Sequence, residues 1–495
     1  MLTAVMDALA FEHHLTSPQG RGRMPQGAAT AIVGGRECCD RICFSIALDA
    51  DRVRDAGFTA TGCGAATAAA SAAVTLVRDR AALAAARLGP SEIAQELGGL
   101  SPGKLHAAEL ACDALHRALG VAVMQRAVPG TARVGRTLVA MSGGVDSAVA
   151  ALLCSQQGHV PPIAVTLELW SDPENDEQRS CCSSSAVAQA RSVAHRMGLA
   201  HLTVELRREF RDGVVNPFIA GFAAGETPNP CVRCNGHVRI DSMLELADRL
   251  GCDRLATGHY ARMTDPADPR GPLLRVAADA AKDQSYMLAA LSPSSLGRLQ
   301  FPLGELRKPE VREIARAAGL SVADKPDSQD LCFLAGTDRA RFLARHGNVA
   351  DRPGELVDTA GNVLGAHRGQ HRFTVGQRRG LGLSGTEPLY VLGKDAAANR
   401  VVVGSRRELA CTEVVVRDVR LHRPGGRVDR VKLRYRSRAL RAALAGEPPA
   451  GTHASLSLSL REHAEGVAPG QLACLMEGEL VIGWGTIGGG ESAGG

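Results

Sequence analysis

The chain has 495 residues, of which 45% are hydrophobic and 22% are charged, so it has the composition of a folded protein rather than a disordered one. At about 150 residues per domain, this length predicts three or four domains. No apolar run approaches the roughly 18 residues that a membrane span needs, so we expect no membrane partner. The first residues include Asp7 and Glu12 and lack a basic stretch, which argues against a secretory signal and predicts a cytoplasmic protein.

The first 128 residues have the pattern of an α+β domain. Apolar residues alternate over 29–48, which predicts two strands. A Gly-Cys-Gly turn at 62–64 then precedes an alanine-rich helix, and residues 89–97 and 103–119 have the periodicity of amphipathic helices. A linker rich in Pro, Gly and Arg follows at 125–136.

The rest of the chain divides into three further parts and a tail. Strands alternate with helices over residues 129–345, which predicts an α/β doubly wound parallel sheet. Short strands separated by glycine turns predict a small central β-rich domain at 346–411 and a C-terminal β-barrel at 412–487. The glycine-rich end, 488–495, is predicted to be disordered.

Positive charge is concentrated in one segment of the chain. Residues 367–441 contain 18 basic and 6 acidic side chains, a net charge of +12, whereas the whole chain carries only +5. A solvated basic face is one interpretation. Because the protein as a whole is nearly neutral, we favour contact with a polyanion such as nucleic acid.

A phosphate-binding loop is predicted at Ser142–Ser147, with the sequence SGGVDS, between an apolar strand and a helix. Two glycines let the backbone approach an anion, and the N-terminus of the helix offers free N–H groups and a positive dipole end. The Gly-Lys-Ser/Thr ending of a Walker A loop is absent. The pattern instead resembles the loop of ATP pyrophosphatases, which adenylate an oxygen and release pyrophosphate.

Two polar loops contain cysteines that could bind a metal or act as reactive thiols. Residues 227–235, TPNPCVRCN, hold Cys231 and Cys234 at the spacing of a metal site or a redox pair. Residues 325–333, KPDSQDLCF, hold Cys332 among polar neighbours, where a thiol is more reactive than in an apolar core. Either loop alone fits an inert cysteine equally well.

Seven ordered motifs complete the pattern: SGGVDS, TPNPCVRCN, ATGHY, KDQSYML, KPDSQDLCF, FTVGQRRGLG and VKLRYRS. In this order they resemble the tRNA-specific 2-thiouridylases over roughly residues 136–487. The resemblance implies that the protein uses ATP, with Mg²⁺, to replace the C2 oxygen of the wobble uridine (position 34) of tRNA by sulfur. It also implies a sulfur donor, either a cysteine desulfurase or a sulfur carrier.

The same resemblance assigns roles residue by residue. Cys234 matches the family's nucleophile, and Cys332 matches the cysteine that carries a persulfide. The residues that match its ATP contacts are Ala140, Met141, Ser142, Gly143, Gly144, Val145, Asp146, Ser147, Leu167 and Gly258. The residues that match its tRNA contacts are Asn229, Pro230, Cys231, His259, Lys282, Asp283, Gln284, Arg434, Tyr435 and Gln471.

One departure from the family leaves the sulfur chemistry open. Many members have Asp where this chain has Cys231. Cys231, Cys234 and Cys332 can therefore ligate three irons of a [4Fe–4S] cluster, whose fourth iron would bind sulfide. We favour the cluster slightly over the persulfide, because Cys231 has no role in the persulfide scheme.

The first domain has a resemblance of its own, over roughly residues 24–124, to iron–sulfur cluster assembly scaffold proteins. It is carried by Cys38-Cys39-Asp40, by Gly62-Cys63-Gly64 and by Lys104-Leu105-His106. The resemblance implies cluster ligands at Cys38, Asp40 and Cys63, but the position of the third cysteine, after His106, is Ala107. Cys112, Cys39 or His106 itself are candidates to replace it. The alternative is a degenerate domain that is kept for stability or docking.

Two other functions fit parts of the sequence. An amide-forming ATP pyrophosphatase would use the same phosphate loop without needing the three loop cysteines. A cluster carrier without catalytic activity would explain the first domain but not SGGVDS. The fusion itself predicts that the first domain delivers a cluster to the second across a flexible linker.

Overall fold

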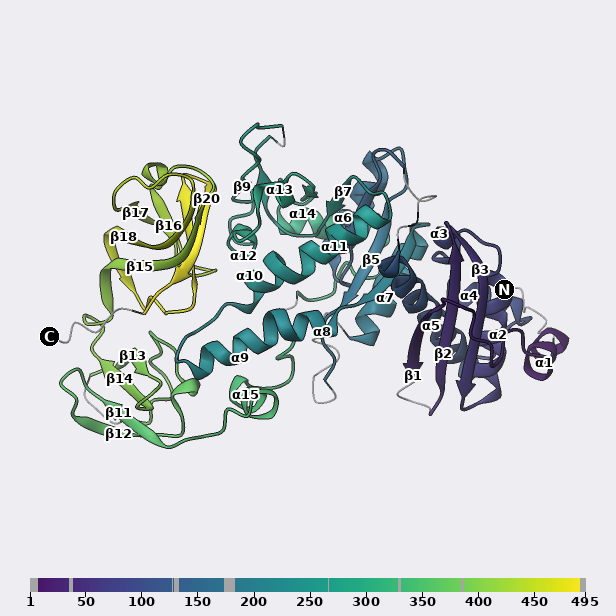
Figure 1. Cartoon of the computed structure of the whole chain (residues 1–495), viewed down its shortest axis with the longest axis horizontal. Coiled ribbons are helices and arrows are strands. Elements are labelled where there is room, and N and C mark those ends of the chain that lie inside the picture. Colours follow the sequence, from purple (N-terminus) through teal and green to yellow (C-terminus); the bar gives the residue numbers. More distant parts are fainter. Residues whose placement is uncertain are drawn as a thin grey trace.

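The computed structural model describes residues 8–34, 39–126, 128, 133–172, 183–265, 267–327, 331–383 and 387–489. Cys38 and the last six residues of the predicted tail lie outside these ranges. The N-terminal unit lies at one end of the long axis, the parallel-sheet unit lies in the middle, and the two β units share the other end (Figure 1). Within the part described, no helix is both long and apolar enough to cross a membrane.

The N-terminal unit is the α+β domain that the sequence predicts. Its antiparallel sheet has the order β1-β2-β3, and α2 and α5 pack against it. The alanines of α2 are almost all buried, so their small side chains let the helix approach the sheet closely. The elements are α1 (Ala8–Thr16), β1 (Ala29–Gly34), β2 (Arg41–Asp49), β3 (Arg52–Thr61), α2 (Gly64–Val77), α3 (Ala82–Ala85), α4 (Pro90–Glu96), η1 (Pro102–Lys104) and α5 (Leu105–Gln125).

The second unit is built on a five-stranded parallel sheet of order β10-β7-β4-β5-β6, which confirms the doubly wound prediction. The chain order reverses beside β4, and ligands bind at such a switch point, beyond the carboxyl ends of the strands. The strands are β4 (Thr137–Ala140), β5 (Ile163–Glu168), β6 (Ala200–Glu205), β7 (Arg254–Ala256) and β10 (Leu299–Gln300). The helices are α6 (Val145–Gln157), α7 (Ser184–Arg196), α8 (Arg207–Phe210), η3 (Arg211–Val215), α9 (Asn216–Ala223), α10 (Pro230–Cys234), η4 (Asn235–Arg239), α11 (Ile240–Arg249), α12 (Ser285–Leu288), α13 (Pro293–Leu296) and α14 (Lys308–Ala317).

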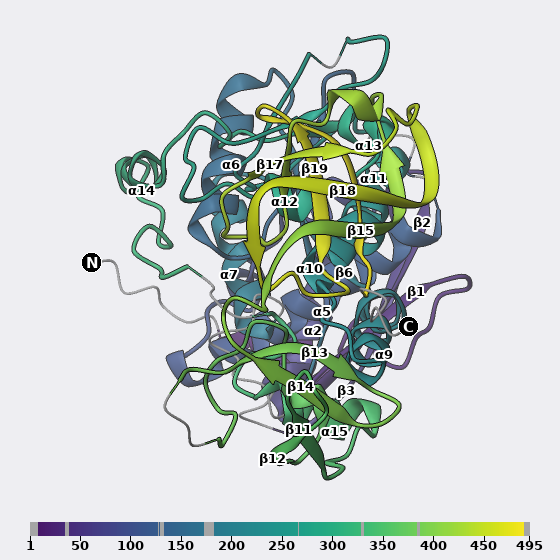
Figure 2. The ribbon, with the colours of Figure 1, turned by 90° about the vertical axis from the view of Figure 1, so that its left-hand side faces the viewer.

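Two β units complete the chain, and Figure 2 shows them one above the other at the C-terminal end. The central unit has a four-stranded sheet of order β12-β11-β14-β13, and the last unit is a barrel of six strands that closes between β15 and β20. Strand β9, from the loop that precedes α12, pairs with β20 and so ties the barrel to the parallel-sheet unit. The elements are β8 (Arg262–Met263), β9 (Leu274–Arg275), α15 (Arg339–Gly347), β11 (Gly354–Val357), β12 (Val363–His367), η5 (Gln370–Arg372), β13 (Tyr390–Asp395), β14 (Arg400–Gly404), β15 (Ala410–Leu421), η6 (Gly425–Arg427), β16 (Arg430–Lys432), β17 (Leu440–Leu444), β18 (Gly451–Glu465), β19 (Leu472–Glu477) and β20 (Leu480–Ile487).

The N-terminal unit is not the separately tethered domain that the linker suggests. Helix α5 packs along β6, the edge strand of the parallel sheet, and buried residues of both units form one hydrophobic core. The backbone N–H of His201 donates to the carbonyl of Ala86 at 2.9 Å across the boundary. An uncovered edge strand presents unpaired polar groups, and α5 with its neighbours covers this one.

Gly120 of α5 packs directly against the backbone of β6. A Cβ there would lie 1.9 Å from the carbonyl oxygen of Thr203. We expect Gly120→Ala to lower the free energy of unfolding by about 1–3 kcal/mol, because overpacking outweighs the roughly 1 kcal/mol gain in helix propensity. Chemical denaturation of the full chain measures this, with Gly103→Ala, in open space, as the control. Equal stability of the two variants would contradict the packing described.

Candidate active site

The SGGVDS loop connects the central strand β4 to α6. Gly143 has a left-handed φ of +71°, and a Cβ there would lie 2.6 Å from the carbonyl oxygen of Ala186. The hydroxyl of Ser147 donates to the carbonyl of Gly144 at 3.0 Å and accepts from the backbone N–H of Ser142 at 3.1 Å. The motif is thus closed by the side chain of Ser147, and α6, with its positive dipole end, begins within it at Val145.

A lysine from another helix holds the acidic residue of this loop. The ammonium of Lys308 lies 2.7 and 2.8 Å from the two carboxylate oxygens of Asp146 and 2.8 Å from Asp327. Tyr260 donates its hydroxyl to Asp146 at 2.8 Å, and Lys282 pairs with Asp327 at 2.7 Å. Burial would raise the pKa of Asp327, but the hydrogen bonds from Lys282 and Lys308 lower it overall. Burial and the carboxylate of Asp146 raise the pKa of Tyr260, so its phenol keeps its proton.

Asp146, Tyr260, Lys282 and Asp327 border a cavity of about 740 Å³ at the carboxyl ends of β4, β5 and β7. Predicted ATP contacts that line it are Ala140, Met141, Ser142, Gly144, Val145, Asp146, Ser147, Leu167 and Gly258. Predicted tRNA contacts that line it are His259, Lys282, Gln284 and Tyr435. Gly143 does not line the cavity but packs against the backbone of α7. The structure therefore brings together most of the predicted ATP contacts and some of the predicted tRNA contacts.

Sequence reasoning missed other lining residues, namely Val165, Arg239, Met243, Thr257, Tyr260, Ala281, Lys325, Pro326, Asp327 and Arg436. Some lay inside recognised motifs: Tyr260 ends ATGHY, and Lys325 and Asp327 belong to the loop that was singled out for its cysteine. Lys325 donates to the carbonyl of Gly143 at 3.0 Å, so this loop contacts the phosphate loop directly. Arg239 follows Cys234 by five residues, and no sequence signal marked it.

His259 is a neutral side chain in this wall. Burial, and then the charge of Arg239, lower the pKa of His259 to about 3. Its Nδ1 lies 2.9 Å from the hydroxyl of Thr257. At neutral pH it can hydrogen-bond to a base or ribose, but it contributes no charge.

The TPNPCVRCN loop is clamped between the parallel-sheet unit and the barrel. Asn229 caps α10 by accepting from the N–H groups of Cys231 and Val232, at 3.2 and 3.3 Å. The amide of Gln471 donates to the carbonyl of Thr227 at 2.5 Å. Pro230 occupies the first turn of α10, which leads without a break into the π-turn η4. Such π-turns are frequent at functional sites.

The three loop cysteines are not in the wall of the cavity. Cys234 is 7% exposed and belongs to the same core as Phe333, while Cys332 packs against that core from outside. Cys231 is partly exposed and lies close enough to Tyr435, a cavity residue, for its charge to raise the pKa of that phenol in addition to burial. Among the residues described, none of the three lines the cavity itself.

The other predicted tRNA contacts are engaged within the protein. Asp283 is 5% exposed, accepts from the N–H groups of Ala277 and Ser285, both at 3.1 Å, and pairs with Lys432 of the barrel at 3.2 Å. The guanidinium of Arg434 donates to the carbonyl of Gly466. In this structure both side chains join elements of the protein to one another.

The basic segment 367–441 is less positive than its sequence indicates. Many of its arginines pair with carboxylates that lie outside the segment: Arg368 and Arg372 with Asp351, Arg400 with Glu355, Arg406 with Glu465, Arg417 with Glu226, Arg423 with Asp268, Arg427 with Glu477 and Arg438 with Glu462. The charge left for a polyanion is correspondingly smaller than +12.

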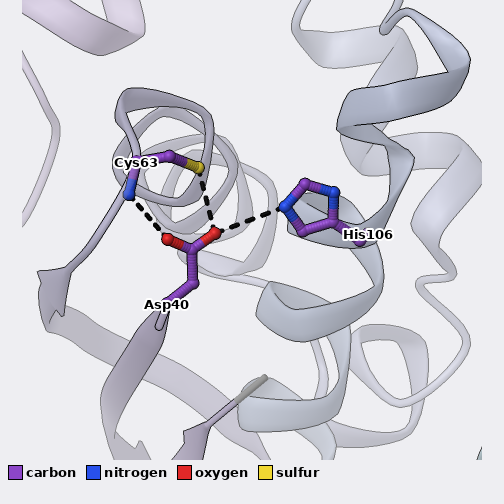
Figure 3. A group of neighbouring side chains, drawn as sticks. All are labelled: Asp40, Cys63 and His106. Carbon is purple, nitrogen blue, oxygen red and sulfur yellow. Dashed lines mark hydrogen bonds and ion pairs between the residues drawn. The ribbon is translucent and has the colours of Figure 1, made fainter. Parts of the chain in front are cut away.

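A second group of potential ligands lies in the N-terminal unit (Figure 3). The carboxylate of buried Asp40 accepts from the backbone N–H of Cys63 at 2.6 Å and from its thiol at 3.0 Å, and lies 3.3 Å from Nε2 of His106. The ligand atoms of the three residues all lie within 4.8 Å of one another, the one such group found among the described residues. Asp40 directly precedes β2, Cys63 follows the end of β3, and His106 lies in the first turn of α5, so these three elements bring the side chains together.

Of the candidates to replace the missing cysteine, His106 is the one that belongs to this group. Ala107 is fully buried, and so is Cys112, whose thiol donates to the carbonyl of Leu88 at 3.4 Å. Burial raises the pKa of Cys112 to about 11, which disfavours a thiolate. In this structure Cys112 is therefore not part of the group that Asp40, Cys63 and His106 form.

Comparison with known proteins matches each unit to a family model. These are a NifU-like N terminal domain (residues 9–126), a tRNA methyl transferase HUP domain (135–336), a tRNA methyl transferase PRC-barrel domain (340–405) and an aminomethyltransferase beta-barrel domain (415–487). The bifunctional protein NifU/MnmA of Rubrobacter xylanophilus is 42% identical over 487 residues, which cover 96% of this chain and 97% of the relative. The tRNA-specific 2-thiouridylase MnmA of Geobacter metallireducens is 41% identical over 360 residues, 71% of this chain and 96% of the relative.

The chain belongs to the tRNA-specific 2-thiouridylase family. The thiouridylase of Rhodospirillum rubrum is likewise 44% identical, over 68% of this chain and 91% of the relative. The present chain is therefore a tRNA sulfurtransferase with an ATP-binding HUP domain. It also carries a NifU-like iron–sulfur domain at its N-terminus. Neither an amide synthetase nor a simple cluster carrier describes the whole chain.

The phosphate loop of this thiouridylase depends on Gly143. Alanine there takes on a left-handed backbone, at about 1–2 kcal/mol, and also contacts the carbonyl of Ala186. We expect Gly143→Ala to weaken ATP binding at least about tenfold, measured by calorimetric titration. Gly361→Ala is the matched control, because Gly361 has a similar φ of +86° but open space around it. Equal ATP affinity in both variants would contradict the role of the loop.

Proposed function

We propose that this thiouridylase adenylates the C2 oxygen of the wobble uridine, position 34 of tRNA, and replaces that oxygen by sulfur through Cys234 and Cys332. The observation that carries the proposal is the single cavity that the phosphate loop shares with His259, Gln284 and Tyr435. Its volume of about 740 Å³ is in the range of small-ligand sites. A nucleotide and one extruded base would have to share it, since a base must leave its stack to react.

The first step makes the oxygen a good leaving group. The C2 oxygen attacks the α-phosphorus of ATP, the bond from that phosphorus to the pyrophosphate oxygen breaks, and the N3 proton of the uracil passes to solvent. The positive end of α6 and the ammonium groups of Lys282 and Lys325 would stabilise the departing pyrophosphate. A Mg²⁺ ion that arrives with ATP would take most ligands from phosphate and water, because Lys308 and Lys282 already pair with Asp146 and Asp327.

The second step brings in sulfur, and its persulfide form needs two cysteines. The terminal sulfur of a Cys332 persulfide attacks C2, and AMP leaves with the former C2 oxygen. The Cys234 thiolate then attacks the Cys332 sulfur, which releases 2-thiouridine and leaves a Cys234–Cys332 disulfide. A dithiol reductant must reduce this disulfide, and a desulfurase or sulfur carrier must restore the persulfide.

The cluster form of the proposal adds Cys231. Cys231 and Cys234 are three residues apart on α10 and so share one helix face, and Cys332 packs against the core that contains Cys234. Three thiols are a suitable donor set for iron. Together they would hold a [4Fe–4S] cluster, which would supply an iron with an open position for sulfide.

The NifU-like domain has a donor set that also fits iron. Asp40, Cys63 and His106 offer a carboxylate, a thiol and an imidazole within 4.8 Å of one another. We propose that they hold a cluster transiently, because fewer than four strong ligands release a cluster more readily. The domain would then deliver this cluster to the catalytic unit of the same chain.

Both forms of the sulfur step need both thiolates. We expect Cys234→Ser and Cys332→Ser each to abolish 2-thiouridine formation, measured by nucleoside analysis of reacted tRNA, while ATP binding stays near normal. Cys411→Ser, at a partly buried cysteine on β15, is the control and should retain activity. Near-normal thiolation by either of the first two variants would defeat the assignment.

Iron content separates the two forms. We expect anaerobically prepared full-length protein to hold iron and acid-labile sulfide, and Cys231→Ser to lose most of the iron in the catalytic unit together with thiolation. Cys63→Ser reports the NifU-like site in the same assay. If Cys231→Ser keeps both its iron and its activity, the cluster form is wrong and the persulfide form stands.

A further inference from the structure

Strand β5 has two faces with different surroundings. Val165 and Leu167 line the cavity, and because side chains alternate along a strand, Thr166 and Glu168 point to the opposite side. Thr166 is 1% exposed and Glu168 is 2% exposed. A buried carboxylate therefore lies next to Leu167, at the end of the strand that borders the nucleotide site.

The partner of this carboxylate comes from the NifU-like domain. The guanidinium of Arg117, on α5, grips both oxygens of Glu168, and one of the two bonds is 2.6 Å long. Arg207 lies further away, at 3.5 Å. Arg117 is itself fixed by Asp113, at 3.1 Å, which pairs in turn with Arg191 of α7 at 2.8 Å. Burial would raise the pKa of Asp113, but the two arginines lower it, so the network stays charged.

A second set of contacts joins the same elements. The hydroxyl of Thr166 lies 2.9 Å from Nε2 of His201 on β6, and Nδ1 of His116 on α5 lies 2.7 Å from the backbone carbonyl oxygen of His201. Burial, and then the charge of Arg191, lower the pKa of His116 to about 3, so it is neutral here. Helix α5 thus supports the outer face of β5 and β6 as one piece.

We propose that Arg117 is a positioning residue for the nucleotide site: through Glu168 it holds the end of β5, and with it Leu167, in the wall of the cavity. The inference rests on the proposed binding of ATP there. It makes the NifU-like domain a structural part of the catalytic site, in addition to any role with iron. Without Arg117, the buried carboxylate loses its bidentate partner and keeps only the 3.5 Å contact with Arg207, so it must turn toward Arg207 or take up a proton, which displaces the strand end.

The experiment compares full-length variants by calorimetric titration with ATP and by the KM for ATP and kcat of tRNA-dependent pyrophosphate release. We expect Arg117→Met to raise the Kd and KM for ATP about tenfold, with a smaller change in kcat, since removing one partner of a buried pair is costly. Arg117→Lys keeps the charge and should restore part of the affinity. Arg87→Ala is the matched control: it removes a 3.0 Å hydrogen bond to Gly198 across the same boundary, away from the cavity.

A double variant separates positioning from simple loss of stability. Glu168→Gln removes the charge that Arg117 must balance, so Arg117→Met with Glu168→Gln should bind ATP more tightly than Arg117→Met alone. Wild-type ATP affinity in Arg117→Met would overturn the inference, and so would a double variant no better than the single one. If wild-type protein binds ATP but releases no pyrophosphate with tRNA, the proposed function fails instead.

Discussion

One buried ammonium group joins the parts of the catalytic cavity. Lys308 begins α14, and its side chain bonds both to Asp146, in the first turn of α6, and to Asp327, in the loop that leads to Cys332. Three segments that are far apart in the sequence therefore meet at one charge. Because two carboxylates this close would otherwise repel each other, the lysine makes their approach favourable. The position of the cysteine loop relative to the phosphate loop depends on this contact.

The first cysteine loop, residues 227–235, contacts the barrel. Gln471 clamps the first loop, and Tyr286 beneath it donates its hydroxyl to the carbonyl of Leu472 at 2.9 Å. The barrel is thus attached to the loop that contains Cys231 and Cys234. A tRNA that binds across the barrel and the HUP domain would meet these thiols at the junction between the two.

Local features of the sequence predicted local structure well. Contacts between residues that are far apart in the sequence could not be predicted from it. The strand, glycine loop and helix around Ser142–Ser147 follow from periodicity and turn chemistry over a few residues. The pairing of Asp146 with Lys308 spans 162 positions, and nothing near either residue indicates the other. For the same reason, the net charge of 367–441 overestimates the local positive charge, because the carboxylates that pair with its arginines lie elsewhere in the sequence. Likewise, a Pro/Gly/Arg-rich linker does not reveal that Gly120 lets α5 pack against β6.

The central claim is that the C2 oxygen of the uridine leaves as part of AMP. The most direct measurement uses tRNA that carries ¹⁸O at C2 of the wobble uridine, with ATP and a sulfur donor, followed by mass spectrometry of the AMP released. The account predicts one ¹⁸O atom in the phosphate of AMP for each 2-thiouridine formed. Unlabelled AMP alongside 2-thiouridine would contradict it, because the oxygen would then have left by another route.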